Sequence, residues 1–497
     1  MSLKKNVIAN YFGQGWSALM GLAFVPLYIK YLGMEAFGLI GLFAMLQAWL
    51  TLFDMGMTPT ISREMSRFKG GAYTLQSIRN LLYSIELICI LISVFIAIGV
   101  WLASGWLATD WLRAEKLPVE TVAQAFSVMG VVTALRFMEG FYHGAIVGLQ
   151  RQILLNVVNS FMATVRGIGA VILLVFVSPT ISVFFIWQAV VSLITVAIFI
   201  IVLRKSLPPL EDKPEFSQSV LTDIWRFAAG MMGLTFLSLL LMQIDKVILS
   251  KMLSLEAFGH YSLVGVVTSG LYYITGPITQ AYYPYITELV TRKDESGLIA
   301  VYHRGSQILT VLVGTAAMML MFFGERIMLL WTGNSTLAND VAPLLAVLTF
   351  GTLLHNMLHM PYILQLAYGY TRLSIYSNIV AVILLVPAVL WVVPLYGAIG
   401  AAWIWGILNL GYMFISMHFL HIRFIPGEKW SWYVMDIGLP LAAAALTSFV
   451  FRCLQPLTSS KPMELSWLFV VGIVTAVSSL FAARDLRCLL ILSWRSR

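Results

Sequence analysis

Charged residues and cysteines are scarce in this chain. Only 11% of its 497 residues are charged and 60% are hydrophobic, so a soluble core of this size would lack the polar surface that it needs. The three cysteines, Cys89, Cys453 and Cys488, lie far apart and show no C-x-x-C spacing, which argues against a disulfide framework and a metal cage. The composition predicts an integral membrane protein without a metal or other cofactor.

The sequence also lacks a single strongly basic segment. The formal net charge is +8, but the basic residues sit in short loops between apolar runs, so we expect topology signals and no nucleic-acid partner. No P-loop occurs in the sequence, and direct use of ATP is therefore not expected. The basic N-terminus leads into an apolar stretch without an A-x-A-like site, which favours a retained first helix over a cleaved signal.

Long apolar runs predict an all-α polytopic membrane protein with about 14 transmembrane helices. A bilayer core of about 30 Å needs about 20 mostly apolar residues in a helix, and these runs are too long and too continuously apolar for barrel strands. The expected spans cover residues 7–29, 37–59, 80–103, 121–149, 153–177, 180–203, 224–249, 258–283, 305–331, 341–368, 374–395, 397–421, 433–453 and 465–484.

Basic residues set the expected orientation, because loops rich in Lys and Arg stay in the cytoplasm. Most of them fall on the side of the N-terminus, which places both termini in the cytoplasm. A linker with three prolines separates the two six-helix lobes, and two further helices with a cytoplasmic tail complete the chain. The expected parts are residues 1–203, the cytoplasmic linker 204–223, residues 224–421 and residues 422–497.

One nine-residue pattern occurs twice. Lys30–Gly38 reads KYLGMEAFG and Lys251–Gly259 reads KMLSLEAFG, so the second copy begins 221 residues after the first. Six expected spans separate the copies, which puts both on the same side of the membrane and indicates a parallel repeat with a pseudo-twofold axis along the membrane normal. A chance match at a helix start is the alternative. Two similar lobes would enclose a cleft that opens alternately to either side.

Three segments resemble the polysaccharide transporters of the multidrug/oligosaccharidyl-lipid/polysaccharide (MOP) exporter superfamily, especially O-antigen flippases of Wzx type. They read YFGQGWSALMGLAFVPLYIKYLGMEAFGLIGLF, LFDMGMTPTISREMSR and QIDKVILSKMLSLEAFGHYSL. The resemblance implies a V-shaped pair of six-helix lobes in the bacterial inner membrane that flips undecaprenyl-diphosphate-linked oligosaccharide outward. It also implies contact with membrane lipid, and it makes a polysaccharide polymerase and a chain-length regulator candidate partners.

Two arginines are expected near the middle of the membrane. Arg136 and Arg166 each lie fifteen residues from Arg151, in the turn between two spans, so both should sit at the same depth, roughly 22 Å along the helix from that turn. A charge at mid-bilayer costs about 2.5–3.5 kcal/mol and needs a partner, water or a function. Guanidinium groups bind phosphate or carboxylate through paired hydrogen bonds, which makes this pair a candidate site for a diphosphate or an acidic sugar.

The two arginines differ in their neighbours along the sequence. Glu139 follows Arg136 by three residues and offers a structural ion pair as the alternative to substrate binding. Arg166 has no acidic neighbour on its own helix and shares a polar face with Asn159 and Asn156. We therefore expect Arg166 to be the stronger substrate-binding candidate.

Other polar residues in the expected spans have two interpretations. The first span has a polar stripe that predicts a cavity wall, with hydrogen bonds between helices as the alternative; it consists of Asn6, Asn10, Gln14, Ser17 and Gly21. Asp245, His355 and His359 are candidates for binding a coupling ion, H⁺ or Na⁺, although interfacial pairing of Asp245 with Lys246 and helix packing of the histidines are favoured. For Asp54 we expect a helix cap or an interface pair.

Three functions compete. A flippase of anionic lipid-linked sugars fits the cationic centre of the expected cavity, whereas a cation-coupled multidrug exporter would place unpaired acidic groups there. A membrane polysaccharide polymerase or acyltransferase should need a large outer loop or clustered acid and base groups, and the sequence contains neither. The flippase, which is not an enzyme, is the preferred hypothesis.

Overall fold

The computed structural model describes residues 3–54, 56–209, 213–216, 236–455 and 460–495. Contacts divide the chain into two compact units, residues 1–260 (unit 1) and residues 261–497 (unit 2). In the described residues nearly all regular structure is helical, and the single β-bridge joins Arg113 to Ser254.

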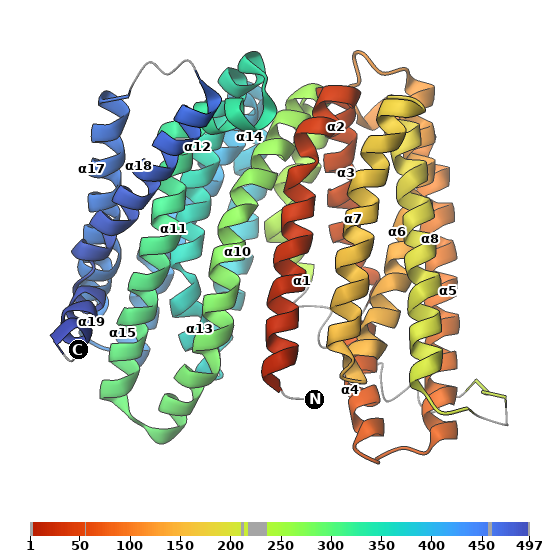
Figure 1. Cartoon of the computed structure of the whole chain (residues 1–497), viewed down its shortest axis with the longest axis horizontal. Helices are drawn as coiled ribbons and strands as arrows, with labels where there is room; N and C mark the ends of the chain where they lie inside the picture. The colour runs from red at the N-terminus through yellow and green to blue at the C-terminus, as the bar shows by residue number, and fades with distance from the viewer. Residues whose placement is uncertain (1–2, 55, 210–212, 217–235, 456–459, 496–497) are drawn as a thin grey trace. The chain divides into compact units, whose positions relative to one another are not determined.

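Unit 1 consists of long helices that run up and down (Figure 1). Their ends follow local signals: Thr74 caps α5 by accepting a hydrogen bond from the amide of Ser77, and Gly33, at φ +84°, separates α2 from α3. The helices are α1 (Leu3–Ala23), α2 (Val25–Leu32), α3 (Met34–Leu50), η1 (Thr51–Asp54), α4 (Met57–Lys69), α5 (Leu75–Trp106), η2 (Leu107–Trp111), α6 (Val119–Gly148), α7 (Gln152–Phe176) and α8 (Ile181–Ser206), followed by helix over residues 236–252.

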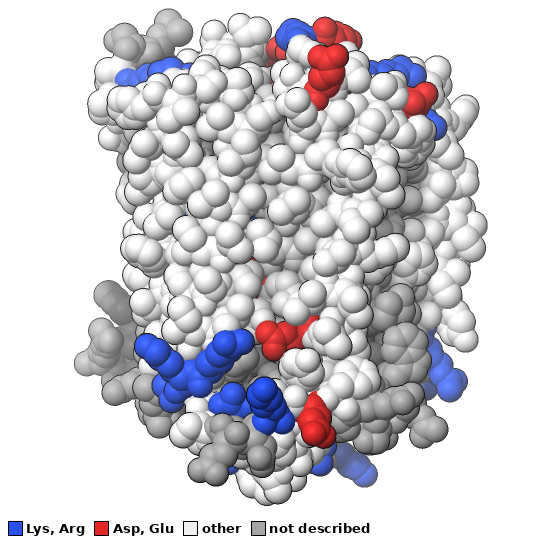
Figure 2. Space-filling view, turned by 90° about the vertical axis from the view of Figure 1, so that its right-hand side faces the viewer, with Lys and Arg blue, Asp and Glu red and all other residues white. Residues whose placement is uncertain are grey.

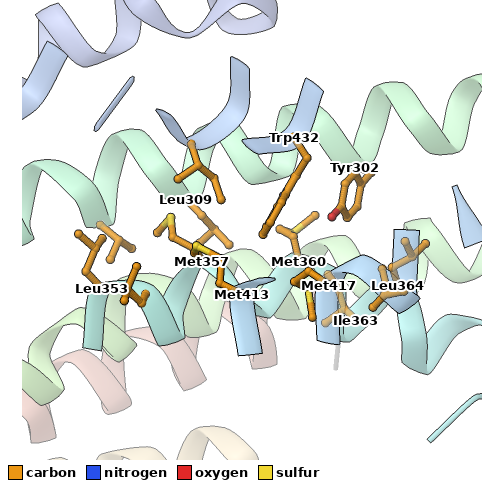
Figure 3. Close-up of a cluster of buried hydrophobic side chains, with 14 of the residues drawn as sticks. Tyr302, Leu309, Leu353, Met357, Met360, Ile363, Leu364, Met413, Met417 and Trp432 are labelled. Atoms are coloured by element: carbon orange, nitrogen blue, oxygen red, sulfur yellow. The ribbon is translucent and has the colours of Figure 1, made fainter. Parts of the chain in front are cut away.

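Unit 2 is entered through α10 (Leu255–Arg292), whose first residues belong to unit 1. The remaining helices are α11 (Glu295–Thr332), α12 (Ser335–Met357), α13 (His359–Ala367), α14 (Arg372–Gly411), η3 (Tyr412–Ser416), α15 (Met417–Phe424), α16 (Lys429–Ser431), η4 (Trp432–Gly438), α17 (Leu439–Cys453), α18 (Lys461–Ala482) and α19 (Arg484–Arg495). Their core contains Tyr302, Met357, Met360 and Trp432, from four different elements (Figure 3).

The expected all-α polytopic fold is confirmed. Eleven helices of the described chain are long and apolar enough to cross a membrane. One of these, residues 372–424, is interrupted at Gly397, at φ +59°, and contains two expected spans; α10 and the helix over 236–252 correspond to two more, which accounts for about fourteen. From the side of α5 and α8, a broad band of uncharged side chains separates two charged ends, as a bilayer requires (Figure 2).

The two copies of the repeated pattern pack against each other within unit 1. A Cβ atom added to Gly38 would overlap the carbonyl oxygen of Leu255, and one added to Gly259 would overlap that of Met34. Gly38 and Gly259 hold the same position in the pattern, as do Met34 and Leu255. The contact is thus reciprocal, as around a local twofold axis, and glycine permits the close approach of the two backbones. The twofold relation of the whole lobes and their expected boundaries stay predictions.

The glutamates of the pattern hold the segment between η2 and α6. Glu35 is 5% exposed, and its carboxylate accepts hydrogen bonds from the amides of Glu115, Lys116 and Leu117, at 2.5, 2.9 and 3.0 Å. Glu256 forms an ion pair with Lys116, and this contact raises the pKa of the Lys116 ammonium. Both copies therefore fix the same connection.

Candidate functional site

A cavity of about 500 Å³ with a mixed apolar and polar wall is lined by residues of unit 1. Its wall is built by α1, α2, α3, α6, α7 and α8, so six helices from one unit converge on it. Apolar residues make up part of the wall, and the polar or ionisable side chains are Ser17, Tyr28, Gln47, Arg136, Glu139, Asn159, Arg166, Gln188 and Thr195.

Arg166, on α7, forms the ion pair of this cavity. Its Nη2 lies 3.4 Å from Oε1 of Glu139 on α6 and 3.2 Å from Oγ of Ser192 on α8. The two charged side chains retain 23% and 17% of their exposure, so they are shielded from solvent yet reach the cavity. Trp187 donates an indole hydrogen bond to the carbonyl oxygen of Arg166 at 3.2 Å, which ties α8 to α7 at this depth.

Arg136, on α6, contacts neutral groups. Its Nη1 donates to Oε1 of Gln47 at 2.7 Å and its Nη2 to Oε1 of Gln188 at 3.4 Å. The guanidinium carbon lies 5.2 Å from the ring centre of Phe43, a cation–π distance. These contacts orient the group without cancelling its charge.

The cavity therefore favours anions. Two guanidinium groups and one carboxylate leave a formal charge of +1 among the lining residues. Buried Nε of Arg136, Nε of Arg166 and Nε2 of Gln47 have no protein acceptor within the described chain. A buried donor without an acceptor is costly, and the oxygens of a phosphate or carboxylate would satisfy such donors.

The structure corrects one expected pairing. Glu139 pairs with Arg166 and not with Arg136, so the expectation that Arg166 stands without an acidic partner is wrong. The spacing along one helix could not reveal this pair, because Glu139 reaches an arginine on the neighbouring helix. Both arginines line the same cavity, and their equal depth in the membrane stays a prediction.

The other expected wall residues are divided. Asn159 lines the cavity. Asn156 lies against Gly13 of α1, with its amide donating to the carbonyl oxygen of Gln152 at 2.8 Å, and it is not among the lining residues. Gln14 is exposed, and the side chain of Asn10 lies outside the described residues. Of the stripe on the first span, Ser17 and Gly21 reach the cavity.

The candidate ion-binding residues lie elsewhere. Asp245 is partly buried on the helix over 236–252, and the neighbouring Lys246 donates to Gln243 at 3.0 Å. In unit 2, His355 Nδ1 lies 3.1 Å from the hydroxyl of Tyr272, and His359 Nδ1 lies 3.2 Å from the carbonyl oxygen of His355. Both histidines take part in an aromatic cluster, which agrees with a packing role.

Asp54 has the expected capping role. Its Oδ1 accepts hydrogen bonds from the amide and the hydroxyl of Thr58, at 3.0 and 2.5 Å, at the start of α4. Among the residues that the structure describes, no group of three or more His, Cys, Asp or Glu side chains could hold a metal ion.

Sequence reasoning missed Gln47 and Gln188, which hold Arg136. Each is a single amide in a long apolar run. A polar side chain in such a run needs a partner, and this is the signal that could have identified them.

Comparison with known proteins supports the fold and a family. Residues 3–290 match the family described as "Polysaccharide biosynthesis protein". The lipid II flippase MurJ in an inward closed conformation aligns with 14% identity and a TM-score of 0.71, over 97% of this chain and 99% of that one.

Two multidrug transporters have a similar fold. An inward-facing MATE transporter of the MOP superfamily aligns with 15% identity and a TM-score of 0.66, over 82% of this chain and 94% of that one. The MATE multidrug transporter DinF-BH aligns with 15% identity and a TM-score of 0.61, over 85% of this chain and 95% of that one. No curated protein matches the sequence.

Proposed function

Because the chain belongs to the polysaccharide biosynthesis protein family and has the fold of MOP-superfamily transporters, we propose that it is a flippase. Its substrate is an undecaprenyl-diphosphate-linked oligosaccharide, such as an O-antigen repeat unit, which it moves from the cytoplasmic to the periplasmic leaflet of a bacterial inner membrane. Alternating access between two lobes carries the headgroup, while the lipid tail stays in the bilayer. A polymerase and a chain-length regulator are the proposed downstream partners.

The observation that carries this proposal is the cationic cavity around Arg136 and Arg166. A diphosphate bears one to two negative charges and presents several acceptor oxygens, which match the guanidinium donors. Asn159, Gln47 and Gln188 add amide groups that suit sugar hydroxyls. Charge and hydrogen-bonding capacity thus fit the same ligand.

The membrane potential supports outward movement. Transfer of one negative charge out of an inside-negative membrane releases about 2.3 kcal/mol per 100 mV. An anionic diphosphate therefore moves outward electrically downhill, without ATP.

The multidrug fold of two similar structures supports the alternative, export of amphipathic cations. The positive cavity disfavours that substrate, because a cation would meet two guanidinium groups and one already paired carboxylate. Polysaccharide polymerisation or acyl transfer has less support, because the cavity lining lacks a paired acid and base beyond Glu139 and the arginines.

The test uses full-length protein in liposomes that contain a fluorescent undecaprenyl-diphosphate oligosaccharide. Arg136→Gln and Arg166→Gln each remove charge-assisted hydrogen bonds, and we expect translocation to fall about 10- to 100-fold. Arg151→Gln is the matched control, because Arg151 is exposed in the turn after α6 and lies outside the cavity. Unchanged rates in both cavity variants, or transport of amphipathic cations in place of the lipid, would contradict the proposal.

Cells provide an independent readout. An Arg166→Ala variant that inserts normally should fail to display surface polysaccharide. Full-length glycan on those cells would show that Arg166 is not part of the proposed substrate-binding site.

A further inference from the structure

A second cluster of ionisable side chains lies in unit 2, apart from the residues used above. His303 of α11 has a carboxylate on each ring nitrogen: Nδ1 lies 2.5 Å from Oδ2 of Asp436 in η4, and Nε2 lies 3.0 Å from Oε2 of Glu428. We call Glu428, His303 and Asp436 the unit 2 triad. The triad joins α11 to the start of α16, through Glu428, and to η4, through Asp436.

The triad must hold at least two protons for both contacts to be hydrogen bonds. Each nitrogen–oxygen contact needs one proton, and a neutral imidazole carries only one N–H group. The second proton therefore resides on an imidazolium ring or on one carboxyl group. If only one proton is present, an imidazole lone pair faces a carboxylate oxygen, which is repulsive. Both hydrogen bonds of His303 therefore require that the triad holds at least two protons.

Exposure decreases along the triad. The side chain of Glu428 is 30% exposed, that of His303 8% and that of Asp436 1%. Tyr302, whose ring centre lies 5.6 Å from that of His303, belongs with Trp432 to the buried hydrophobic cluster of unit 2 (Figure 3). A proton can therefore enter at Glu428 and reach Asp436 through the imidazole, which accepts at one nitrogen and releases at the other.

Asp436 is connected to the C-terminal helix through one amide. Gln307, one turn after His303 on α11, donates from Nε2 to Oδ1 of Asp436 at 2.9 Å. Its Oε1 accepts hydrogen bonds from two amides in the first turn of α19, those of Asp485 and Leu486, at 2.9 and 3.3 Å. An ionised Asp436 keeps the amide of Gln307 in this orientation and also favours the positive end of α19.

The other ionisable groups around the triad are partly paired among themselves. His421 donates from Nδ1 to the carbonyl oxygen of Met417 at 2.7 Å, and its Nε2 lies 3.1 Å from the hydroxyl of Tyr302. Lys429 lies 3.0 Å from His418. Further charged or ionisable groups on the adjoining elements include Tyr282, Arg304, Tyr433, Arg484, Asp485 and Arg487.

We propose that Glu428, His303 and Asp436 form a proton-binding site, and that protonation of Asp436 releases α19 through Gln307. A protonated carboxyl group is a weaker acceptor and can itself donate to Oε1 of Gln307, which competes with the amides of α19. This inference goes beyond the proposed translocation. Its test needs no lipid-linked substrate, so one proposal can fail while the other stands.

One introduced and one native cysteine make the test possible in the full-length protein in lipid nanodiscs. Ala483→Cys, in a Cys488→Ser background, places a thiol at a fully buried position directly before α19, and Cys453, at the end of α17, is exposed. The ratio of their maleimide labelling rates reports release of α19, while Cys453 corrects for the pH dependence of thiol chemistry. From about pH 8 to about pH 5, the range in which histidine sites titrate, we expect the ratio to rise about tenfold, which corresponds to about 1.4 kcal/mol.

Variants distinguish proton binding at the unit 2 triad from its effect on α19. Asp436→Asn should give a high labelling ratio at every pH and should lose the infrared carboxylic acid C=O band that appears in the wild type on acidification. Gln307→Leu should release α19 at every pH but keep that band. Glu428→Gln, a change at the exposed end, should shift the midpoint, whereas His418→Gln should behave as the wild type. A flat wild-type ratio, or the same band in Asp436→Asn, would overturn the inference.

Discussion

Glu35 is a buried charge whose partners are all backbone groups. Three consecutive amides donate to its carboxylate, at the start of a connection that also contacts Glu256. Charge-assisted hydrogen bonds of this kind compensate the desolvation of a carboxylate. The shape of the side chain therefore matters less here than its acceptor oxygens.

Glu35→Ala should destabilise the protein by about 1–3 kcal/mol, because three partly buried amides lose their charged acceptor. Glu35→Gln keeps one acceptor oxygen and should lose less. The measurement is thermal unfolding of the purified protein in nanodiscs. Equal stability of the wild type and the alanine variant would contradict the role assigned to this side chain.

The Arg166–Glu139 pair is a second case at the scale of single residues. Glu139→Gln leaves Arg166 without its carboxylate at a partly shielded site, and we expect a loss of about 1–3 kcal/mol, at the lower end of values for broken buried pairs because both groups keep some exposure. Glu139→Gln combined with Arg166→Gln should recover part of that loss. A double-mutant cycle on unfolding free energies measures the coupling.

The candidate site was only partly predictable from the sequence. Arg136 and Arg166 could be identified because charged residues are rare in apolar runs. Their equal distance from Arg151 along the sequence predicted that they lie close together, and both line one cavity. The pairing of Glu139 across helices was not predictable, because helical periodicity orders residues on one helix and carries no information about the rotation of its neighbour. The same limit hid the role of Gln188.

At the scale of helices, the repeated glycines decide how closely two backbones approach. Gly38→Ala and Gly259→Ala would each place a methyl group on a carbonyl oxygen of the other copy. We expect each to cost about 1–3 kcal/mol, the usual range for overpacking. Gly99→Ala in α5 is the control, because its added Cβ would meet nothing within 4 Å. Unfolding temperatures that fall equally in all three variants would contradict the reciprocal contact.

The start of α11 should depend on pH. Asp294 accepts hydrogen bonds from the amide of Gly297 and the hydroxyl of Ser296, at 2.9 and 3.0 Å, and these bonds lower the pKa of its carboxyl group. A lowered folded pKa means that the stabilisation is complete above the unfolded value, about 3.9, and is lost as pH falls through the folded value.

Asp294→Ala should therefore unfold at a lower temperature than the wild type at neutral pH, and this difference should shrink below about pH 4. Asp294→Asn keeps a capping oxygen without a charge, and its effect should vary little with pH. The measurement is a series of unfolding curves for the three proteins. A difference that grows on acidification would show the opposite linkage.

Helix positions were more predictable than helix ends. A membrane helix must bury about 20 apolar residues, and that requirement located nearly every span. The ends extend into the interface: α5 covers Leu75–Trp106 and α11 covers Glu295–Thr332, beyond the expected 80–103 and 305–331. Polar residues at these ends can remain helical because water and lipid headgroups solvate them, and hydropathy alone does not register this.

At the scale of the whole molecule, the distribution of basic residues predicts the orientation of the chain in the membrane. About fourteen spans and positive loops on one side predict that both termini lie in the cytoplasm. The segment between η2 and α6, which holds Lys116, should then lie in the periplasm.

Reporter fusions test this orientation directly. A fluorescent protein joined after Arg497 should fluoresce, because it folds in the cytoplasm, and alkaline phosphatase inserted after Lys116 should be active, because it needs the oxidising periplasm for its disulfides. Alkaline phosphatase inserted after Lys293, in the turn between α10 and α11, is the matched control and should be inactive. Alkaline phosphatase activity at Lys293 with none at Lys116 would show that the protein has the opposite orientation in the membrane. The electrical argument for outward movement depends on which ends of the helices face the cytoplasm. That result would therefore also reverse the predicted direction of transport relative to this chain.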